Sequence, residues 1–509
     1  MKRSFRLALV LITLGLLAGC VRPGPTSEPW MLSPLQSGTS AVQPTPFQPA
    51  LTYLPPTRQP GSPVQSPTPD TPHALPTLRP NEESYIVQPS DTLGTIAQKY
   101  GVDADTLAAV NKIENPNLLS VGQSLTIPAP EPQSTGADFK ILPDSELIYG
   151  PASALFDIAA FVQAEGGYLA QYQEEVDDQP TSGTAIVARI SYEYSVNPRL
   201  LLALLEYQSG WVTRKDIDPN QDDYPMAYPD SNRPGLYRQL AWAANNLNRG
   251  FYLWQVNALP SVVLPDGSVV PLAATINAGT AGVQYLMSLL YNRSGWDSAV
   301  SESGVYAVYN NFFGYPFDLA VEPLLPEGLS QPAMQLPLEA GPSWSFTGGP
   351  HAGWGDGSAW AALDFAPPGE GQGCVQSDAW VTAVADGLVI RSGNGVVVLD
   401  LDGDGLEQTG WTVLYLHIET RDRVALGTQV KAGDRIGHPS CEGGLSNGTH
   451  FHMARRYNGM WISADGTLPF NLDGWISAGT SIEYNGTLTR NGQVVEAWDR
   501  RVDENQISR

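Results

Sequence analysis

The run SNGTHFHM, residues Ser446–Met453, places two histidines two positions apart near the C-terminal end of this 509-residue chain. In a β-strand, side chains at positions i and i+2 leave the same face, so His450 and His452 would point at one region of space. On a helix the same two side chains would diverge, and helical metal sites use the i, i+4 spacing instead. The run therefore predicts a strand that directs two imidazoles at one candidate metal position.

The other histidines strengthen this prediction, because five of the six fall in the last third of the chain: His351, His417, His438, His450 and His452. His351 follows the glycine-rich segment 346–350, which predicts a turn. Asp364 lies thirteen residues later in an apolar, strand-like run, where a carboxylate needs a partner to offset its burial. His438 is predicted to be a loop residue.

Alternation of apolar residues predicts a strand over Trp411–His417. Leu414 and Leu416 would lie on one face of this strand. Tyr415 and His417 would then share the other face, towards the candidate site.

These segments together resemble the zinc endopeptidases of the lysostaphin and beta-lytic type, which cut peptide cross-links of bacterial cell walls. The resemblance covers residues from about 341 to 480, and its four motifs occur in the family's order. It implies that His351, Asp364 and His452 bind one Zn²⁺ ion and that His417 and His450 are the catalytic histidines. Three such ligands leave a tetrahedral zinc ion one position for a water molecule, as a catalytic site requires. The alternative is that these histidines only satisfy hydrogen bonds in the core.

The start of the chain predicts export. Residues 2–6 are basic and Leu7–Leu17 is apolar, the length of a signal peptide and too short to span a bilayer. Residues 17–20 resemble a bacterial lipobox, which implies that residues 1–20 are a signal peptide and that the thiol of Cys20 is lipidated. The protein is then expected in the cell envelope, anchored to the membrane. A soluble secreted protein is the alternative.

Two further cysteines, Cys374 and Cys441, lie in the peptidase-like region. An even pair in an exported domain predicts a disulfide bond, with free thiols as the alternative. The bond would lie nine residues before His450 and would steady the approach to the His-x-His strand.

Two segments precede the helical part of the chain. Residues 21–83 are rich in Pro, Ser, Thr and Gln and are predicted to form a semi-rigid, disordered linker. Residues 84–130 predict a strand, two helices and a strand, with Ser90 or Asp91 capping the first helix.

The unit at residues 84–130 resembles a LysM module, whose family binds polymers of N-acetylglucosamine. The resemblance implies a glycan-binding groove, and its residues here would be Asp91, Thr92, Leu93, Asn117 and Leu118. Alternatively, Leu93 belongs wholly to the core and Asp91 only caps a helix.

Residues 137–330 predict a mainly α-helical domain. The run Asn197–Trp211 resembles the catalytic helix of lytic transglycosylases with the goose-lysozyme-like fold. That family has a glutamate directly before Ser-Gly, but this chain has Gln208, and an amide cannot donate a proton to a leaving glycoside oxygen. Glu206 would point to a different face of the helix. The domain is therefore predicted to be lysozyme-like and inactive, and retained glycan binding is left open.

From Trp344 onward the apolar period is two and glycine-rich turns separate short strands, which predicts an antiparallel all-β domain over residues 338–485 and a tail over 486–509. Residues 400–405 match the first half of a calcium loop, but Trp411 stands where the glutamate should be. A hairpin turn is predicted here, and Ca²⁺ binding is the less favoured alternative, at Asp400, Asp402 and Asp404.

The net charge of −24 argues against nucleic acid as a partner, which needs a basic surface. Taken together, the multidomain chain is predicted to be a membrane-anchored zinc metalloendopeptidase that hydrolyses peptidoglycan peptides and reaches the wall through its LysM module. One alternative is a wall-binding or activator protein without catalysis. The other is a dual hydrolase that also cleaves glycan.

Overall fold

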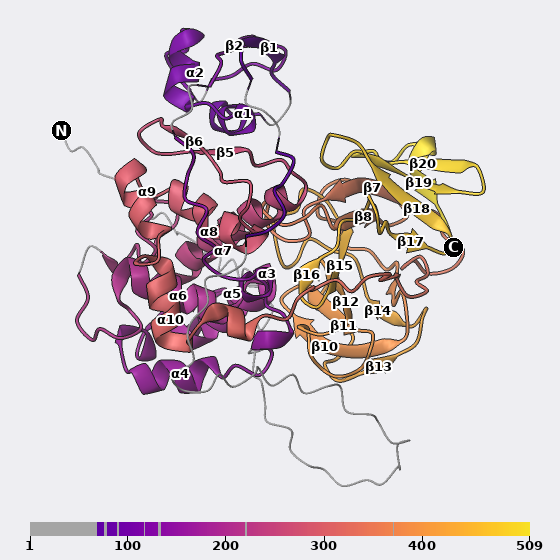
Figure 1. Ribbon diagram of the computed structural model, residues 1–509. Helices are drawn as coiled ribbons and strands as arrows, with labels where there is room; N and C mark the ends of the chain where they lie inside the picture. Colours follow the sequence, from indigo (N-terminus) through magenta and orange to yellow (C-terminus); the bar gives the residue numbers. More distant parts are fainter. Residues whose placement is uncertain are drawn as a thin grey trace, which may run out of the picture.

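The protein is described here by a computed structural model that covers residues 69–509 except 76–78, 89–90, 117, 131–133, 219–220 and 370. The predicted signal peptide, Cys20 and the linker as far as residue 68 lie outside the described residues. Figure 1 shows a small N-terminal module above a helical middle domain, which lies beside a C-terminal β domain. Within the described ranges, no helix combines the length and the apolar character needed to cross a membrane.

The N-terminal module has the predicted order of elements, namely β1 (Glu83–Ile86), α1 (Leu93–Tyr100), α2 (Ala104–Val110) and β2 (Ser124–Ile127). The two strands pair antiparallel, and the helices pack against them through a small apolar core. The helix cap differs from the prediction. Thr92 caps α1 in a reciprocal capping box with Thr95, whereas the Asp91 carboxylate accepts hydrogen bonds from the hydroxyl of Tyr85 and the backbone N–H of Gln88.

The middle domain is mainly helical, as predicted, and consists of α3 (Asp144–Leu147), α4 (Ile158–Glu165), α5 (Gly183–Tyr194), α6 (Pro198–Ser209), α7 (Leu236–Gln255), α8 (Ala278–Ser288), α9 (Arg293–Ala299) and α10 (Val305–Phe313). The middle domain also contains two short hairpins. One is formed by β3 (Gln173–Val176) and β4 (Gln179–Ser182), and the other by β5 (Ser261–Val263) and β6 (Val269–Pro271). Helix α6 is buried on nearly every side and forms the centre of the domain. It starts where the Asn197 side chain caps it and ends at Gly210, which adopts the left-handed conformation.

The chain enters and leaves the N-terminal module at the same part of the middle domain. On the entering side, the backbone N–H groups of Asp70 and His73 donate to the carbonyls of Thr275 and Ala274, at 3.0 and 2.9 Å. On the leaving side, Gly136 donates to the carbonyl of Pro271 at 2.9 Å. The prediction of a disordered linker up to residue 83 is therefore wrong for residues 69–75, because backbone hydrogen bonds, which composition does not reveal, dock this segment.

The C-terminal domain is built on a nine-stranded antiparallel sheet in the order β13-β10-β11-β12-β15-β8-β7-β21, with β16 paired to β15. Its strands are β7 (Trp344–His351), β8 (Ala362–Ala366), β10 (Gly387–Gly393), β11 (Val396–Asp400), β12 (Trp411–Leu416), β13 (Gln429–Val430), β15 (Phe451–Tyr457), β16 (Met460–Trp461) and β21 (Gln506–Ile507). A second sheet contains β17 (Asn471–Leu472), β18 (Trp475–Gly479), β19 (Gly486–Arg490) and β20 (Gln493–Glu496), and β9 (Val381–Thr382) pairs with β14 (Arg435–Gly437).

Residues 486–509 are not the predicted tail. They supply β19 and β20 to the second sheet, and β21 pairs with β7 through Gln506 to Ser345 and Ile507 to Trp344. Ile507 is buried in the core of the β domain, so the end of the chain is part of this domain.

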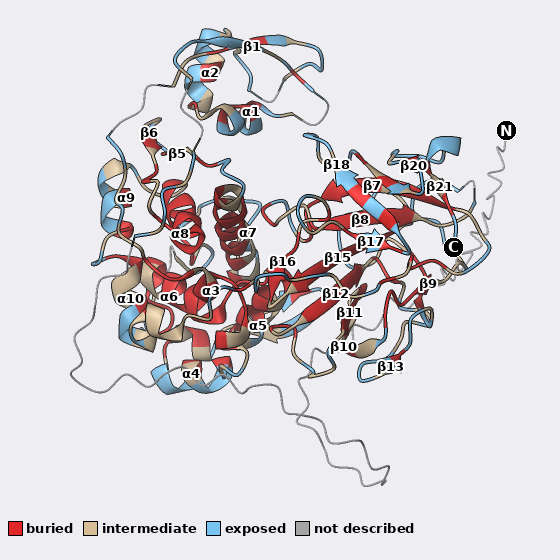
Figure 2. Ribbon diagram, turned by 45° about the vertical axis from the view of Figure 1, so that its right-hand side comes forward, coloured by how far each residue is buried: buried red, intermediate tan, exposed pale blue. Residues whose placement is uncertain are grey.

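The main sheet buries both faces. Along β11 and β12, Val397 and Val413 belong to the core of the β domain, whereas Val398 and Leu414 belong to the core of the middle domain. Ala454 of β15 joins the latter core as well. Figure 2 shows these buried strands lying against the helices of the middle domain. One hydrophobic core therefore continues across the boundary between the two domains.

A buried ion cluster reinforces this boundary. Glu407 pairs with Arg391 at 2.8 Å and with Arg456 at 3.4 Å, and all three side chains are almost fully buried. Arg456 also donates to the backbone carbonyl of Tyr192 in the middle domain at 3.2 Å. One buried carboxylate thus pairs with two buried guanidinium groups.

We expect Glu407→Ala to lower the free energy of unfolding by about 3–5 kcal/mol, because it removes the carboxylate that pairs with two buried guanidinium groups. Denaturant unfolding of the full chain measures this effect. Lys431→Ala is the matched control, since it breaks the exposed pair with Asp386 and should change stability little. Equal effects of the two substitutions would contradict the prediction.

Candidate metal centre

Strand register brings the first two candidate ligands together. Strand β15 pairs with β8 so that His452 lies directly opposite Asp364. On its other side β15 pairs with β12, where Leu416 is opposite His452. Ala454 and Ala362 lie two residues from His452 and Asp364 and belong to the core of the middle domain. Because side chains two residues apart share a face of a strand, His452 and Asp364 point to this same face of the sheet.

His351 reaches the same point from β7 because this strand is irregular. Its pairing with β8 shifts register twice, between Phe346 and Gly348 and again between Gly348 and His351. Segment 346–350 is thus a bulged strand rather than the predicted turn. A Cβ atom at Gly348 would collide with the Asp364 carboxylate, so glycine is required here for the close approach of the two strands.

The three candidate ligand atoms lie at the spacing of a metal site. Nε2 of His351 is 3.0 Å from Nδ1 of His452, and each of these atoms is 3.2 Å from Oδ1 of Asp364. Tetrahedral zinc with bonds of about 2.0–2.1 Å separates its ligand atoms by roughly 3.3 Å. Oδ1 of Asp364 is buried and accepts no hydrogen bond from the described residues. Both observations fit a divalent cation held by His351, Asp364 and His452.

Backbone carbonyls orient both imidazoles. Nδ1 of His351 is 2.8 Å from the Gly349 carbonyl, and Nε2 of His452 is 3.0 Å from the Gly353 carbonyl. A nitrogen that donates to a carbonyl leaves the other ring nitrogen as the metal ligand, so these contacts select Nε2 of His351 and Nδ1 of His452.

The electrostatics of Asp364 and His452, though not of His351, favour the protonation states that metal binding needs. Burial alone would raise the pKa of Asp364, but the imidazole of His351, together with those of His452 and His450, holds it well below its usual range. Burial lowers the pKa of His452. For His351, the Asp364 carboxylate outweighs burial and raises the pKa. An ionised carboxylate and neutral imidazoles are the forms that bind metal.

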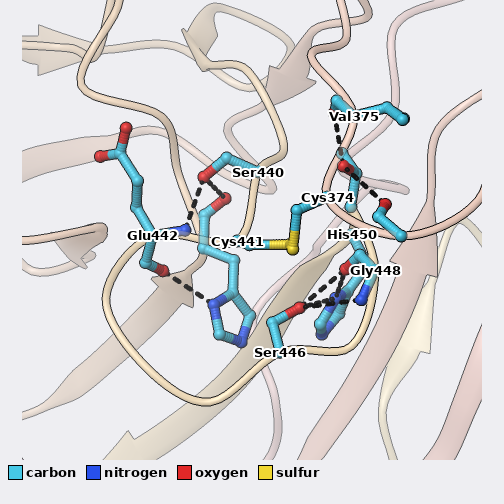
Figure 3. Close-up of a disulfide and its surroundings, with 11 residues drawn as sticks. Cys374, Val375, Ser440, Cys441, Glu442, Ser446, Gly448 and His450 are labelled. Carbon is cyan, nitrogen blue, oxygen red and sulfur yellow. Dashed lines mark hydrogen bonds between the residues drawn. A yellow bond between two sulfur atoms is a disulfide. The ribbon is translucent and has the colours of Figure 1, made fainter. Parts of the chain in front are cut away.

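The two predicted catalytic histidines lie beside the ligands. The rings of His417 and His450 are 4.5 Å apart, and Nε2 of His450 is 3.9 Å from Oδ2 of Asp364. Nδ1 of each ring is 2.8 Å from a backbone carbonyl, that of Glu442 for His417 and that of Gly448 for His450 (Figure 3). Each ring therefore keeps Nε2 for chemistry. Burial, with smaller contributions from His450 and His452, lowers the pKa of His417 to about 3.

His417 faces the site because of its backbone conformation and not because of the alternation of side chains along the strand. Strand β12 ends at Leu416, and His417 adopts a left-handed conformation with φ of 64°. Tyr415 points the opposite way, into the core of the β domain, where its hydroxyl accepts a hydrogen bond from the backbone of Val384. The prediction that Tyr415 faces the site is therefore wrong.

Cys374 and Cys441 form the predicted disulfide bond (Figure 3). Beside it, the backbone N–H of Thr449 donates to the Gly373 carbonyl at 3.0 Å. The bond thus fixes the segment that contacts the residue directly before His450.

We expect the double substitution Cys374→Ser/Cys441→Ser to lower the free energy of unfolding by roughly 4 kcal/mol, because the bond closes a loop of 67 residues. Denaturant unfolding of the full chain measures this loss. The reduced wild-type chain serves as a second test, since it should unfold at the same denaturant concentration as the double variant. An unchanged midpoint would contradict the expected contribution.

Tyr484, which the sequence prediction missed, also contacts the centre. Its ring stacks on His351 at 4.2 Å, and the Glu483 carboxylate next to it accepts a hydrogen bond from the backbone of Ala352. Burial, then the charges of Asp364 and Glu483, raise the pKa of Tyr484 to about 12. No local motif marks this residue, because it reaches His351 from the connection between β18 and β19, 133 positions away.

The predicted glycan site of the N-terminal module is only partly described. Leu93 is 3% exposed and belongs to the module's core, in line with the alternative interpretation, whereas Leu118 is 72% exposed. Thr92 and Asp91 make the helix-cap and turn contacts given above. Asn117 lies outside the described residues. A glycan site at these five positions remains a prediction.

Glu206 and Gln208 of the middle domain both have structural partners. The Glu206 carboxylate accepts hydrogen bonds from the backbone of Val212 and from the backbone and hydroxyl of Thr213. Gln208 accepts a hydrogen bond from the Tyr291 hydroxyl at 2.5 Å. A pocket of about 530 Å³ in this domain is lined by Tyr168, Gln171, Tyr172, Gln173, Asp222 and Asp223. The inactivity of this domain towards glycan stays a prediction.

The carboxylates of Asp400, Asp402 and Asp404 come together in the loop between β11 and β12. Asp400 accepts hydrogen bonds from the backbone of Asp402, Gly403 and Gly405, as expected of a tight turn. Burial and the neighbouring Asp400 raise the pKa of Asp402 to about 7. Calcium binding at this loop stays a prediction.

Comparisons with known families agree with this division of the chain. Residues 85–128 match the LysM domain, residues 140–324 match the N-terminal domain of LasA, and residues 372–464 match peptidase family M23. The chain thus carries a LysM domain, a LasA-like middle domain and an M23 peptidase domain. The M23 match starts after His351 and Asp364, so the place of these two residues in the site is supported by the strand geometry and not by this match. The lysozyme-like resemblance of the middle domain stays a prediction.

The chain is similar to parts of several known proteins. Protease LasA of Pseudomonas aeruginosa is 26% identical over 358 residues, which cover 64% of this chain and 75% of the relative. N-acetylmuramoyl-L-alanine amidase XlyA of Bacillus subtilis is 46% identical over 48 residues, 9% of this chain and 16% of the relative. The solved structure of the deep-sea M23 metalloprotease pseudoalterin is 25% identical and covers 35% of this chain and 100% of its own, with a TM-score of 0.29.

Proposed function

We propose that the protein is a zinc metalloendopeptidase that hydrolyses peptide bonds of bacterial peptidoglycan, at glycyl or similar small-residue bonds. The observation that carries the proposal is the assembly of His351, Asp364 and His452 beside His417 and His450. It is supported by the M23 match and by similarity to a relative named as a protease. When bound, zinc would polarise the scissile carbonyl and acidify a water molecule.

The chain's own residues supply the rest of the chemistry. Nε2 of His450 and of His417 can each hold or donate a proton, because Nδ1 of each ring is engaged by a carbonyl. The histidine that remains protonated can stabilise the developing oxyanion. A wall-binding protein without catalysis would not need this complete set.

We further propose that lipidated Cys20 anchors the protein to the membrane on its extracytoplasmic side. The LysM domain would hold the enzyme on glycan strands, so that a bound wall presents its peptides at high local concentration. The segments that flank this domain, at Asp70–His73 and at Gly136, are docked on the middle domain.

We expect His452→Ala to lose stoichiometric zinc and all cleavage, because it removes a ligand. His450→Ala should keep zinc and lose activity by roughly 10²–10⁴-fold, the usual size of a proton-transfer contribution. Metal content per chain and cleavage of cell walls, with and without a chelator, measure these outcomes. His438→Ala is a matched control, a buried histidine of the same domain outside the site, and should keep both properties. Zinc retained by His452→Ala but lost by His450→Ala would reverse the assigned roles.

Replacing residues 84–130 with a short Gly/Ser linker should strongly weaken cleavage of intact sacculi. Cleavage of a short soluble peptide should not change, because the metal centre is untouched. The substitution is tolerable since the flanking segments dock within a few residues of each other, at Pro271 and at Ala274–Thr275. Equal losses on both substrates would show that the LysM domain only supports the peptidase structurally.

A further inference from the structure

The loop between β7 and β8, residues 352–361, here called the ligand loop, orients one of the candidate ligands. Its base supplies the Gly353 carbonyl, which lies 3.0 Å from Nε2 of His452. The loop is compact because Gly353 donates to the Ala359 carbonyl at 3.1 Å, and the backbone of Trp354 donates to the Ser358 hydroxyl at 3.0 Å. A displacement of its tip is therefore transmitted to its base.

The tip of the ligand loop rests on helix α7 of the middle domain. The Asn245 side chain donates to Oδ1 of Asp356 at 2.5 Å and accepts from the backbone N–H groups of Asp356 and Gly357, at 3.1 and 3.0 Å. One turn along the same helix face, Arg249 pairs with Oδ2 of Asp356 at 2.7 Å. A single amide thus satisfies both the side chain and the backbone of the tip.

The loop sequence is adapted to this contact. A Cβ atom at Gly357 would collide with the backbone carbonyl of Asn245, and one at Gly355 would collide with the Asn245 side chain. Gly355 also has φ of 64°, in the left-handed region. The atoms that a Cβ would meet at these two glycines belong to α5 and α7 and not to a candidate ligand, so the helix contact explains them.

The base of the loop is held by the middle domain as well. A Cβ atom at Gly353 would collide with the ring of Trp461, so the two are in close contact. The backbone N–H of Trp461 donates to the Tyr252 hydroxyl at 2.9 Å, and its indole donates to the Tyr194 carbonyl at 3.3 Å. Helices α5 and α7 therefore fix the ligand loop from two directions.

We propose that the middle domain is a working part of the metal centre, in which Asn245 is a positioning residue that holds the ligand loop and, through the Gly353 carbonyl, the ring of His452. The proposal rests on the proposed zinc peptidase function. It predicts that the docked domain supports metal retention rather than merely covering the sheet. Partners that orient a metal ligand directly contribute roughly 10–100-fold in affinity, so a residue one step further away should contribute about tenfold or less.

The test uses the zinc-loaded full chain. Asn245→Ala should speed zinc loss to a chromophoric chelator by several-fold, up to about tenfold. It should also raise hydrogen exchange of the amides at residues 353–358. Ser195→Ala is the matched control, because it removes another hydrogen bond across the same boundary, to the Gly459 carbonyl at 2.6 Å in the turn between β15 and β16. It should leave zinc loss and loop exchange unchanged even where it lowers the melting temperature.

A compensating double substitution distinguishes a positioning role of Asn245 from a general loss of stability. Asn245→Asp places a second carboxylate against Asp356 and should loosen the loop at least as much as the alanine substitution. The pair Asn245→Asp/Asp356→Asn restores a donor opposite an acceptor and gives Arg249 a carboxylate four residues before it, so zinc loss should return towards the wild-type rate.

Three outcomes would overturn the proposal. Equal zinc loss from the two alanine variants would make the contact purely structural. Higher activity of Asn245→Ala would make it a restraint on the enzyme. A wild-type chain that binds no zinc would overturn the proposed function together with this inference, whereas the first two outcomes leave that function intact.

Discussion

The register between β8 and β15 is the constraint on which the candidate site depends. It places Asp364 opposite His452, and a slip of one residue would turn one of the two side chains to the other face of the sheet. Strand β15 is held on its other side by β12, so the register is set twice. The bulged β7 then brings His351 to the same point, and Gly348 leaves room for the carboxylate. The three ligand atoms are thus carried by paired strands rather than by free loops.

Local patterns predicted the elements whose form depends on local sequence. His452 lies on β15, and His450 lies directly before this strand in a bridge with Ser440. The period of apolar residues marks the helices of the middle domain, and the N-terminal module has its expected order. The sequence patterns failed mainly where the structure of a segment depends on a partner that lies far away in the sequence. Segment 346–350 reads as a turn, yet it belongs to a strand because β8 pairs with β7. Within residues 486–509, β21 pairs with β7 far back along the chain, whereas β19 and β20 pair locally with β18 and with each other and were missed all the same.

Two other failures have different physical causes. Alternation along β12 holds as far as Leu416 and then breaks, because His417 adopts a left-handed conformation that no periodicity reveals. The proline-rich segment at 69–75 is ordered through backbone hydrogen bonds and the ion pair between Asp70 and Lys140, which composition cannot show. The candidate ligands were recognisable from residue type and order, but the partners that orient them, such as the Gly353 carbonyl, were not.

The continuous core between the middle domain and the main sheet also affects how the chain must fold. The middle domain is synthesised first. Part of its apolar surface stays uncovered until Val398, Leu414 and Ala454 have been made, and Ala454 comes 166 residues after Ser288, the end of α8. Until β15 is in place, both partners expose surface that favours association with other chains. The protein therefore depends on conditions that keep the first half of the chain apart from its neighbours until the second half has emerged.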